Sequence, residues 1–420
     1  LPDGLNVIRV RASKSPVQFQ VAFTRQGTPR TWVPDSQTAL PSTRWTQSDT
    51  TSGTLARTDD AFAIDDIPIP SSNPWRRNVR LADLAFTSGG RAAAVTYDGD
   101  VWRIEGLEGD LARVRWRRFA SGFHEPLGIC QRGDELFVND RNGIWRLRDT
   151  DGNGEADRHE LFSNAFTQTA ETREFATGFR LAPDGSFIIS KGGQQTSTVG
   201  RDNGTVLRVA ADGRSSTVLG WGLRMPFIGV HPRTGLVTAS DQQGHYVPAT
   251  PLHIIQDQHF HGFIPLVLPK ERYPAPIADP LTWIPHPVNA SGASQVWLVD
   301  GKMGPLNDAL IHLGYFRPEI FLVRWNHRGT RPQAAVISLT RSLNFSPLNG
   351  AVNPADGQLY VTGMQIWGTI APQISGLARV RYTGAPCPLP REVAAMDKGL
   401  LLRFEEPLEP IAATNLANVS

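Results

Sequence analysis

The sequence predicts an all-β protein, a six-bladed β-propeller with an N-terminal β-rich appendage. Dense turn residues are the first sign, because 39 Gly and 32 Pro among 420 residues make about one residue in six, against roughly 12% in an average protein. The second sign is a lack of helical periodicity, since Gly or Pro interrupts most windows in which apolar residues could recur at helical spacing. The third is an internal repeat.

Each copy of the repeat holds an apolar strand, a tight turn, a second apolar strand that ends in polar residues, and a strand that ends in Arg. Turns such as Pro-Asp-Gly and Arg-Thr-Gly suit hairpins. Blades stacked around an axis explain a period of about 45–70 residues. An array of β-sandwiches, the alternative, explains the recurrent polar strand ends less well. The six copies span residues 84–104, 127–148, 180–213, 229–244, 293–325 and 351–382.

The chain divides into three segments. Residues 1–74 are expected to form the N-terminal β-rich segment, and residues 75–385 the propeller. Residues 386–420 read as a linker and the start of an immunoglobulin-like module that is too short to be complete, so we expect the native chain to continue. No signal peptide stands at the N-terminus, so we expect any such peptide to have been removed.

Charge and hydropathy exclude two classes of protein. With 42 basic and 40 acidic residues the net charge is +2, which excludes a nucleic-acid binder that works by bulk positive charge. No run approaches 18 consecutive apolar residues, so no membrane-spanning helix is expected. Lys is scarce, since 37 of the basic residues are Arg, and each Lys is therefore worth locating.

The strongest local motif is DTDGNGEADRHE, which satisfies the spacing of an EF-hand calcium loop. Alternating acidic side chains on a tight loop supply the oxygen ligands that Ca²⁺ requires. The loop follows a predicted strand, so we expect an EF-hand-like loop in a blade hairpin, with a structural role. The alternative is a solvated acidic turn. The predicted ligands are Asp149, Asp151, Asn153, the carbonyl of Glu155, Asp157 and, optionally, Glu160.

Polar residues recur at corresponding places in several copies, after the strand that we expect to lie nearest the axis, where a propeller builds its ligand site. They lie at 190–194, 240–245, 300–302 and 362–367. Two of the five lysines occur there, and their charge suits a carboxylate, a sulfate or an anionic sugar. Polar strand ends are also common without any ligand. The predicted cofactor-binding residues are Lys191, Gln194, Asp241, Gln242, Lys302 and Gln365.

Histidines cluster in the second half of the chain. Their spacing suits a second metal at the axis, although histidines scattered over the surface or engaged in hydrogen bonds are the commoner case. The cluster consists of His245, His253, His259 and His261, with His286 further on.

Two loops carry further candidates for catalysis. His124, followed by Glu125, is a candidate general base. Arg224, on a turn with Gly222, is a candidate anion binder, with a structural bridge between blades as the alternative. We therefore take His124, His245 and Arg224 as the catalytic candidates. P-loop, dinucleotide-binding, serine-hydrolase, haem-attachment and zinc-protease motifs do not occur.

The run GTVLRVAADG…GWGLRMPFIGVHPRTGLVTASDQQG resembles the soluble quinoprotein glucose/sorbosone dehydrogenase superfamily of six-bladed propellers. The phrases GFHEPLGI, WRLRDTDGNGEADRHELF and VRYTGAPCPLP look closer to secreted multidomain proteins of planctomycetes and verrucomicrobia called membrane-bound-dehydrogenase-like, which often carry a cytochrome c module. The resemblance covers about residues 74–390.

The resemblance implies an enzyme that oxidises sugars with pyrroloquinoline quinone (PQQ) and calcium. Arg224 matches the quinone-contacting Arg of the family, whereas Met225 stands where the family prefers Asn. In the family, the catalytic His comes after a particular strand. In this sequence no His stands there, and His124 comes before the corresponding strand. Lys302 would take the place of a Lys that binds a quinone carboxylate.

The favoured function is therefore a secreted or periplasmic, quinone-dependent sugar dehydrogenase-like protein with a structural calcium site. Its partners would be a carbohydrate or other small-molecule substrate and further domains of the native chain, of cytochrome c type in the resemblance. One alternative is a metal-assisted polysaccharide lyase or glycoside hydrolase with an axial His, Gln and Arg site. Another is a propeller that binds sugar without catalysis.

Overall fold

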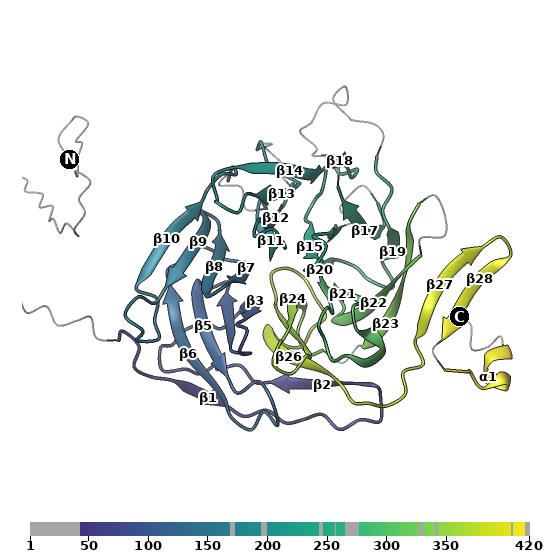
Figure 1. Ribbon diagram of the computed structural model, residues 1–420, viewed down its shortest axis with the longest axis horizontal. Helices are drawn as coiled ribbons and strands as arrows, with labels where there is room; N and C mark the ends of the chain where they lie inside the picture. The colour runs from purple at the N-terminus through teal and green to yellow at the C-terminus, as the bar shows by residue number, and fades with distance from the viewer. Residues whose placement is uncertain are drawn as a thin grey trace, which may run out of the picture. The chain divides into compact units, whose positions relative to one another are not determined.

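The computed structural model describes residues 43–168, 173–194, 200–242, 247–256, 258–264, 277–326, 331–340, 343–404 and 406–415. Six antiparallel sheets follow one another around a central axis, which confirms the predicted six-bladed propeller (Figure 1). Successive blades pack through their innermost strands, which form a closed ring of neighbours. Among the described residues, no helix is long and apolar enough to cross a membrane.

In each of the first three blades, the chain runs from the innermost strand outward. Blade 1 contains β3 (Leu81–Phe86), β4 (Ala92–Thr96), β5 (Asp100–Glu105) and β6 (Val114–Ser121), with β1 (Asp49–Thr51) paired outside β6. Blade 2 contains β7 (Gly128–Arg132), β8 (Glu135–Asp140), β9 (Gly143–Arg148) and β10 (Arg158–Ser163). Blade 3 contains β11 (Ala176–Leu181), β12 (Phe187–Lys191), β13 (Thr205–Val209) and β14 (Ser216–Trp221), with β18 (His259–Phe260) paired parallel to β14.

The last three blades repeat this order. Blade 4 contains β15 (Phe227–Val230), β16 (Val237–Ser240), β17 (Ala249–Ile255) and β19 (Thr282–Pro285). Blade 5 contains β20 (Gly292–Trp297), β21 (Leu310–Gly314), β22 (Glu319–Asn326) and β23 (Gln333–Thr340), with the short helix η2 (Gly304–Leu306) after β20. Blade 6 contains β24 (Pro347–Val352), β25 (Leu359–Met364), β26 (Ser375–Tyr382) and, outermost, β2 (Phe62–Ile67).

The ring is closed by β2, a strand from the segment that the sequence assigned to an appendage. It pairs antiparallel with β26, and buried Asp65 lies 2.9 Å from both Arg379 and Arg381. The structure therefore differs from the expected boundary at residue 74, because residues 62–67 belong to the ring. Beyond the ring, β27 (Pro390–Met396) and β28 (Gly399–Phe404) form a hairpin, followed by α1 (Pro410–Thr414).

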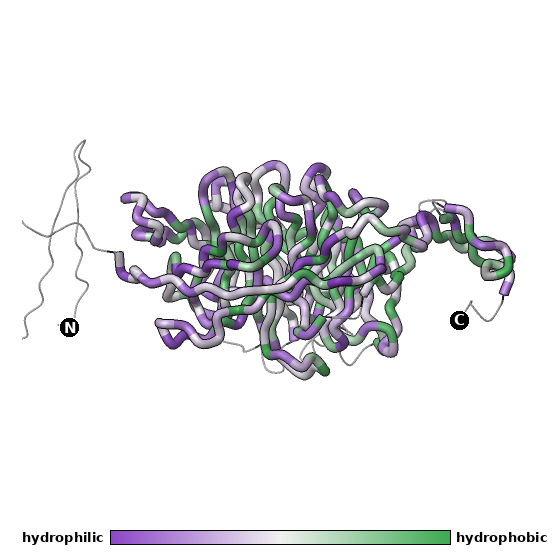
Figure 2. The backbone as a smooth tube through the Cα atoms, turned by 90° about the horizontal axis from the view of Figure 1, so that it is seen from below, coloured by the Kyte–Doolittle hydropathy of each residue, from purple (hydrophilic) through white to green (hydrophobic). Residues whose placement is uncertain are grey.

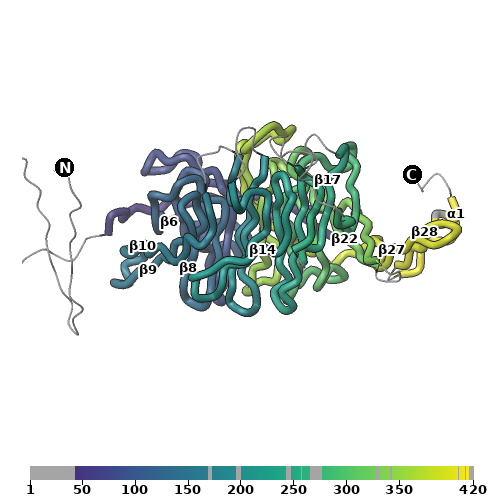
Figure 3. The backbone as a smooth tube through the Cα atoms, turned by 90° about the horizontal axis from the view of Figure 1, so that it is seen from above, coloured from purple at the N-terminus to yellow at the C-terminus, as the bar shows by residue number. Residues whose placement is uncertain are grey.

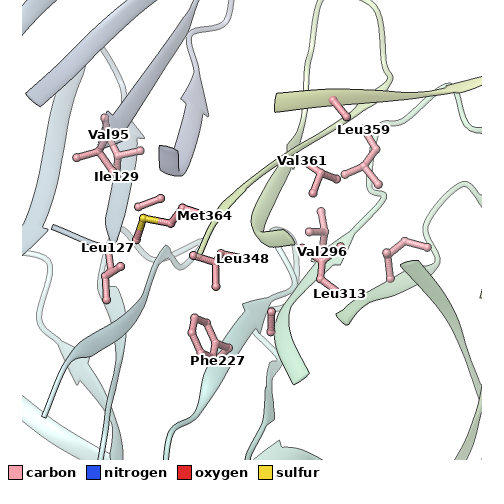
Figure 4. Packing of buried hydrophobic residues seen from close by; sticks show 14 of the residues in the cluster. Val95, Leu127, Ile129, Phe227, Val296, Leu313, Leu348, Leu359, Val361 and Met364 are labelled. Carbon is pink, nitrogen blue, oxygen red and sulfur yellow. The ribbon is translucent and has the colours of Figure 1, made fainter. Parts of the chain in front are cut away.

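Apolar side chains from the inner strands fill the space between the blades. Val95, Ile129, Phe227, Leu348 and Val361 belong to the largest buried cluster and come from four different blades (Figure 4). Along the chain, hydrophobic stretches concentrate in the strands and hydrophilic ones at many of the loops (Figure 2). Burial of this apolar surface against neighbouring blades explains why single blades do not occur alone.

A polar network crosses the axis. Arg180 in blade 3 pairs with buried Asp83 in blade 1 at 2.7 Å and donates to Asn349 in blade 6 at 2.5 Å. Asn349 also accepts a hydrogen bond from Ser294 in blade 5. The inner strands also approach closely, since a Cβ at Gly128 would stand 2.3 Å from Phe179 Cβ. These contacts fix the blades relative to one another.

The loops gather at two faces of the ring (Figure 3). We call upper the face that carries the loops leading into each innermost strand and the loops between second and third strands. The lower face carries the loops between first and second strands and between third and fourth strands. This alternation follows from the antiparallel order of each blade.

Candidate functional site

All six blades contribute side chains to the loops of the upper face. They are Tyr97 from blade 1, Glu125 and Arg141 at blade 2, Phe175 and Lys191 at blade 3, Arg224 and Gln242 at blade 4, Tyr315 from blade 5, and Gln365 and Trp367 from blade 6.

A charged cluster centres on Glu125. Arg141 Nε donates to Glu125 Oε2 at 2.5 Å, and Tyr97 donates a hydrogen bond to the same carboxylate. Burial raises the pKa of Glu125, but the hydrogen bonds from Arg141 and Tyr97 outweigh burial and hold the pKa below its usual value. The φ of Glu125 is +49°, in the left-handed region where a residue with a side chain is strained.

Sequence reasoning noted Glu125 only as the neighbour of His124 and missed Tyr97 and Arg141. No local motif could have found them, because Tyr97 belongs to blade 1 and the other two residues to blade 2. His124 itself is exposed on the loop that leads into β7. Its backbone N–H donates to Asp140 Oδ2 at 3.0 Å, which fixes the loop and leaves the imidazole at the rim.

Phe175 connects this cluster to blade 3. Its ring lies 6.4 Å from that of Tyr97, edge to face, and the Arg141 guanidinium stands 4.7 Å from its centroid. The carbonyl of Phe175 accepts a hydrogen bond from Gly192 at 2.9 Å. The charged cluster and blade 3 thus form one continuous surface.

The predicted residues Arg224, Asp241 and Gln242 come together at blade 4. Buried Asp241 accepts hydrogen bonds at 2.7 Å from the backbone N–H groups of Arg224 and Met225, so it holds the turn. Arg224 Nη1 donates to Gln242 Oε1 at 2.6 Å. Arg224 is thereby held at the rim by a neutral side chain, while its backbone carbonyl accepts from Gly193.

The two predicted lysines do not occupy equivalent places. Lys191 ends β12 as expected, but it is fully buried and pairs with buried Glu174, so it cannot reach a ligand in this arrangement. Lys302 is exposed in the loop between β20 and β21, at the lower face. The prediction for Lys302 is wrong because residues 293–302 form the first strand of blade 5 and its exit, whereas Tyr315 follows the second strand.

The histidine cluster is divided. His245 lies outside the described residues. His253 on β17 and His261 after β18 face each other with ring centroids 4.6 Å apart, buried away from the innermost strands, and their four ring nitrogens have no hydrogen-bond partner in the described ranges. His286, before β20, lies at the upper face. The predicted grouping of these histidines at the axis is therefore wrong for His253 and His261.

The acidic loop lies at the lower face of blade 2, between β9 and β10. It brings carboxylate oxygens of Asp149, Asp151 and Asp157 within 4.8 Å of one another. Asn153 lies beside them and donates from Nδ2 to Asp151 at 3.0 Å. Glu160 instead pairs with Arg146 at 2.6 Å.

The loop contacts a segment far away in the chain. The side chain of buried Glu155 accepts a hydrogen bond from the backbone of Trp45 at 2.6 Å, which leaves only its carbonyl for the predicted role. The optional ligand Glu160 stands on β10 and is engaged by arginines, so the structure does not place it with the three aspartates.

Comparisons with known proteins give the fold. Residues 88–249 match a family described as a domain of unknown function, DUF7133. Comparison with curated proteins finds no match. The soluble aldose sugar dehydrogenase of Escherichia coli is 12% identical with a TM-score of 0.58, covering 76% of this chain and 99% of its own.

Two further solved structures agree. The PQQ-bound aldose sugar dehydrogenase of Streptomyces coelicolor is 14% identical, with a TM-score of 0.52 over 80% of this chain and 99% of that one. The PQQ domain of pyranose dehydrogenase from Coprinopsis cinerea is 11% identical, with a TM-score of 0.54 over 81% and 98%. At such low identities the likeness concerns the six-bladed fold.

Proposed function

We propose that the upper face binds PQQ and oxidises a sugar. The observation that carries this proposal is a set of buried polar atoms on this face: Gln194 Oε1, His286 Nε2 and Trp367 Nε1, none of which has a hydrogen-bond partner among the described residues. A buried polar atom left unpaired costs about 1–3 kcal/mol. A polar ligand on this face would relieve that cost.

The side chains present include a cation and two aromatic rings that suit a planar anion. Arg224 is a half-buried cation at this face that hydrogen-bonds a neutral side chain, and guanidinium groups bind carboxylates through two parallel hydrogen bonds. Arg80 and Arg141 are already paired with Asp98 and Glu125. Phe175 and Trp367 add aromatic surface for a flat ring system. Lys191 does not take part, because Glu174 already neutralises it.

In the proposed reaction, the cofactor accepts the electrons and side chains of this protein handle the proton and bind the anion. When bound, the quinone supplies a two-electron acceptor for the oxidation of a sugar hydroxyl. His124 accepts the hydroxyl proton, since its imidazole is exposed at the rim. The hydrogen bonds from Arg141 and Tyr97 hold the pKa of Glu125 below its usual value, and Gln242 holds Arg224 for the anion. Secretion and a cytochrome c-like partner domain remain predictions from the resemblance.

We also propose that the loop 149–160 binds calcium in a structural role. Three carboxylates within 4.8 Å repel one another, and a divalent cation with oxygen ligands removes that repulsion. The loop stands at the lower face, opposite the proposed quinone site, so its calcium would stabilise the blade 2 hairpin without touching the reaction.

Reconstitution tests the enzymatic proposal. Purified chain mixed with PQQ and Ca²⁺ should retain a chromophore on gel filtration and reduce an artificial dye with aldoses. Arg224→Gln should weaken quinone binding at least tenfold, whereas Arg214→Gln, on an exposed lower-face turn, should not. Absence of a retained chromophore, or of dye reduction across a panel of aldoses, would contradict the proposal. Chelator-sensitive cleavage of a polysaccharide would favour the lyase alternative instead.

A further inference from the structure

A cleft of about 700 Å³ lies between blades 1 and 2 at the lower face, opposite the proposed quinone site. One wall is the β5–β6 pair of blade 1, and the other is formed by the turns of blade 2 that precede β8 and follow β9. Every residue that lines it belongs to the described ranges.

Three arginines meet in this cleft. Arg103 in β5 and Arg117 in β6 stand directly opposite each other in the strand pair, and Arg91 precedes β4 on the same wall. Like charges directly opposite in an antiparallel pair are destabilising. In the part of the chain that the structure describes, the side chains of these three residues form no ion pair or hydrogen bond, and the carboxylate of Asp149 is the opposite charge that acts on Arg103.

Arg103 is the innermost of the three. Its guanidinium lies over the ring of Phe119, 4.2 Å from the centroid, and the residue is half-buried. Burial, followed by the charge of Arg91, lowers the pKa of Arg103, and the opposite charge of Asp149 offsets part of that effect. Electrostatic attraction is stronger at such a place than at an exposed one, because less water screens the charges.

Carboxylates around the cleft are engaged or lie at its rim. Glu135 pairs with Arg148 at 2.7 Å, and Asp149 accepts hydrogen bonds from the backbone of its own loop. Glu105 and Asp134 are exposed at the rim. The inner part of the cleft therefore holds the guanidinium groups of Arg103 and Arg117 without an ion pair among the described residues, with the Asp149 carboxylate as the nearby opposite charge.

Uncharged polar groups complete the wall. Thr87 Oγ1 is buried with no hydrogen-bond partner in the described residues, and Ser88 lies next to it on the cleft wall. A ligand with hydroxyl groups as well as anionic groups would satisfy both the threonine and the arginines. A volume of about 700 Å³ accommodates more than a single small oxyanion.

We propose that this cleft binds an acidic saccharide, a sugar chain that carries carboxylate or sulfate groups. Arg103 and Arg117 receive the anionic group, and Thr87 and Ser88 bind sugar hydroxyls. The site is separate from the proposed oxidation of a sugar at the upper face and does not depend on it.

Calorimetric titration of the purified chain tests the proposal, with digalacturonate and a sulfated chondroitin disaccharide as probes. At least one should bind, with an affinity that falls as salt is raised. Arg117→Gln and Arg103→Lys should each weaken binding at least tenfold, the latter because Lys lacks the planar fork. Arg214→Gln, which removes an exposed charge from blade 3, should leave the affinity unchanged.

Each of three results would overturn the proposal. The first is that neither saccharide binds. The second is that both saccharides bind the Arg117→Gln variant as tightly as the unaltered chain while both proteins melt at the same temperature. The third is tighter binding of inorganic pyrophosphate than of either saccharide, which would make the cleft a site for small oxyanions.

Discussion

The buried pair His253 and His261 makes the stability of this protein depend on pH. Burial lowers the pKa of His261 from 6.5 to about 4, and burial together with His261 lowers that of His253 well below its usual value. A histidine whose pKa is lower in the folded state stabilises the fold above the unfolded pKa, and that contribution is lost as the pH falls from about 6.5 towards 4.

We predict that His261→Gln flattens this dependence. Between pH 7 and pH 5 the unfolded chain takes up a proton at this histidine and the folded chain does not, which costs about 2 kcal/mol. Urea unfolding at the two pH values should show that the unaltered protein loses about that much more stability than the variant. His231→Gln, at a half-exposed turn, should keep the original slope. Equal slopes for His261→Gln and the unaltered protein would disprove the assignment.

Single residues also show what the sequence could not reveal. The scarcity of Lys drew attention to Lys191 as a cofactor-binding residue, and this lysine ends β12 at the upper face. Its pairing with Glu174 depends on a residue from the loop before β11, brought close only by the fold. The sequence around a lysine at a strand end is the same whether the side chain faces a ligand or a buried carboxylate, so the sequence cannot distinguish the two cases.

At the level of elements, the acidic loop between β9 and β10 gives the next prediction. Asp151→Ala should abolish the rise in melting temperature that Ca²⁺ produces, because it removes one of three converging carboxylates. Calcium at one hundred times its dissociation constant should stabilise the unaltered protein by about 2.7 kcal/mol. Scanning calorimetry with and without Ca²⁺ measures both effects.

The matched control for this loop is Glu160→Gln. Glu160 pairs with Arg146 and Arg148 rather than with the loop, so its variant should keep the calcium response. If Ca²⁺ left the melting temperature of the unaltered protein unchanged, the loop would be the solvated acidic turn that its sequence also permits.

Hairpin chemistry made most strands predictable, because turns such as Pro183-Asp184-Gly185 join strands at fixed spacing. The prediction was wrong in blade 5, where η2 (Gly304–Leu306) lengthens the connection from β20 to β21. A long connection carries no turn signature, so Lys302 looked like the end of a second strand. Lys302 was assigned to the wrong strand end because the connection between β20 and β21 is longer than in the other blades, whereas the composition of the strands was not misleading.

At the scale of the molecule, the number of blades was readable from the repeat, but the closure of the ring was not. β2 and β26 pair over more than 300 residues of sequence, and no local pattern in residues 62–67 shows which sheet they complete. The same holds for the upper-face cluster, whose members are adjacent only because the blades are arranged in a ring.

Ring closure by β2 leads to the last prediction. A chain that begins at residue 45 should keep the melting temperature and cooperative unfolding of the full chain, because residues 45–420 form one compact unit. A chain that begins at residue 75 loses β2, which exposes the edge of β26 and leaves Arg379 buried without Asp65. It should melt at least 10 °C lower or aggregate through the open edge, as judged by calorimetry and gel filtration.

The Asp65→Asn variant distinguishes the contribution of the Asp65 charge from that of the pairing between β2 and β26. Arg379 is only 3% exposed, so removing its partner carboxylate should cost about 3–5 kcal/mol in urea unfolding while β2 can still pair. Asp66→Asn, on the opposite face of the same strand, should cost far less, because Asp66 is exposed and its partner is Asn344. If the chain that begins at residue 75 unfolded at the same temperature as the full chain, β2 would not contribute to the stability of blade 6, and the ring would close without it.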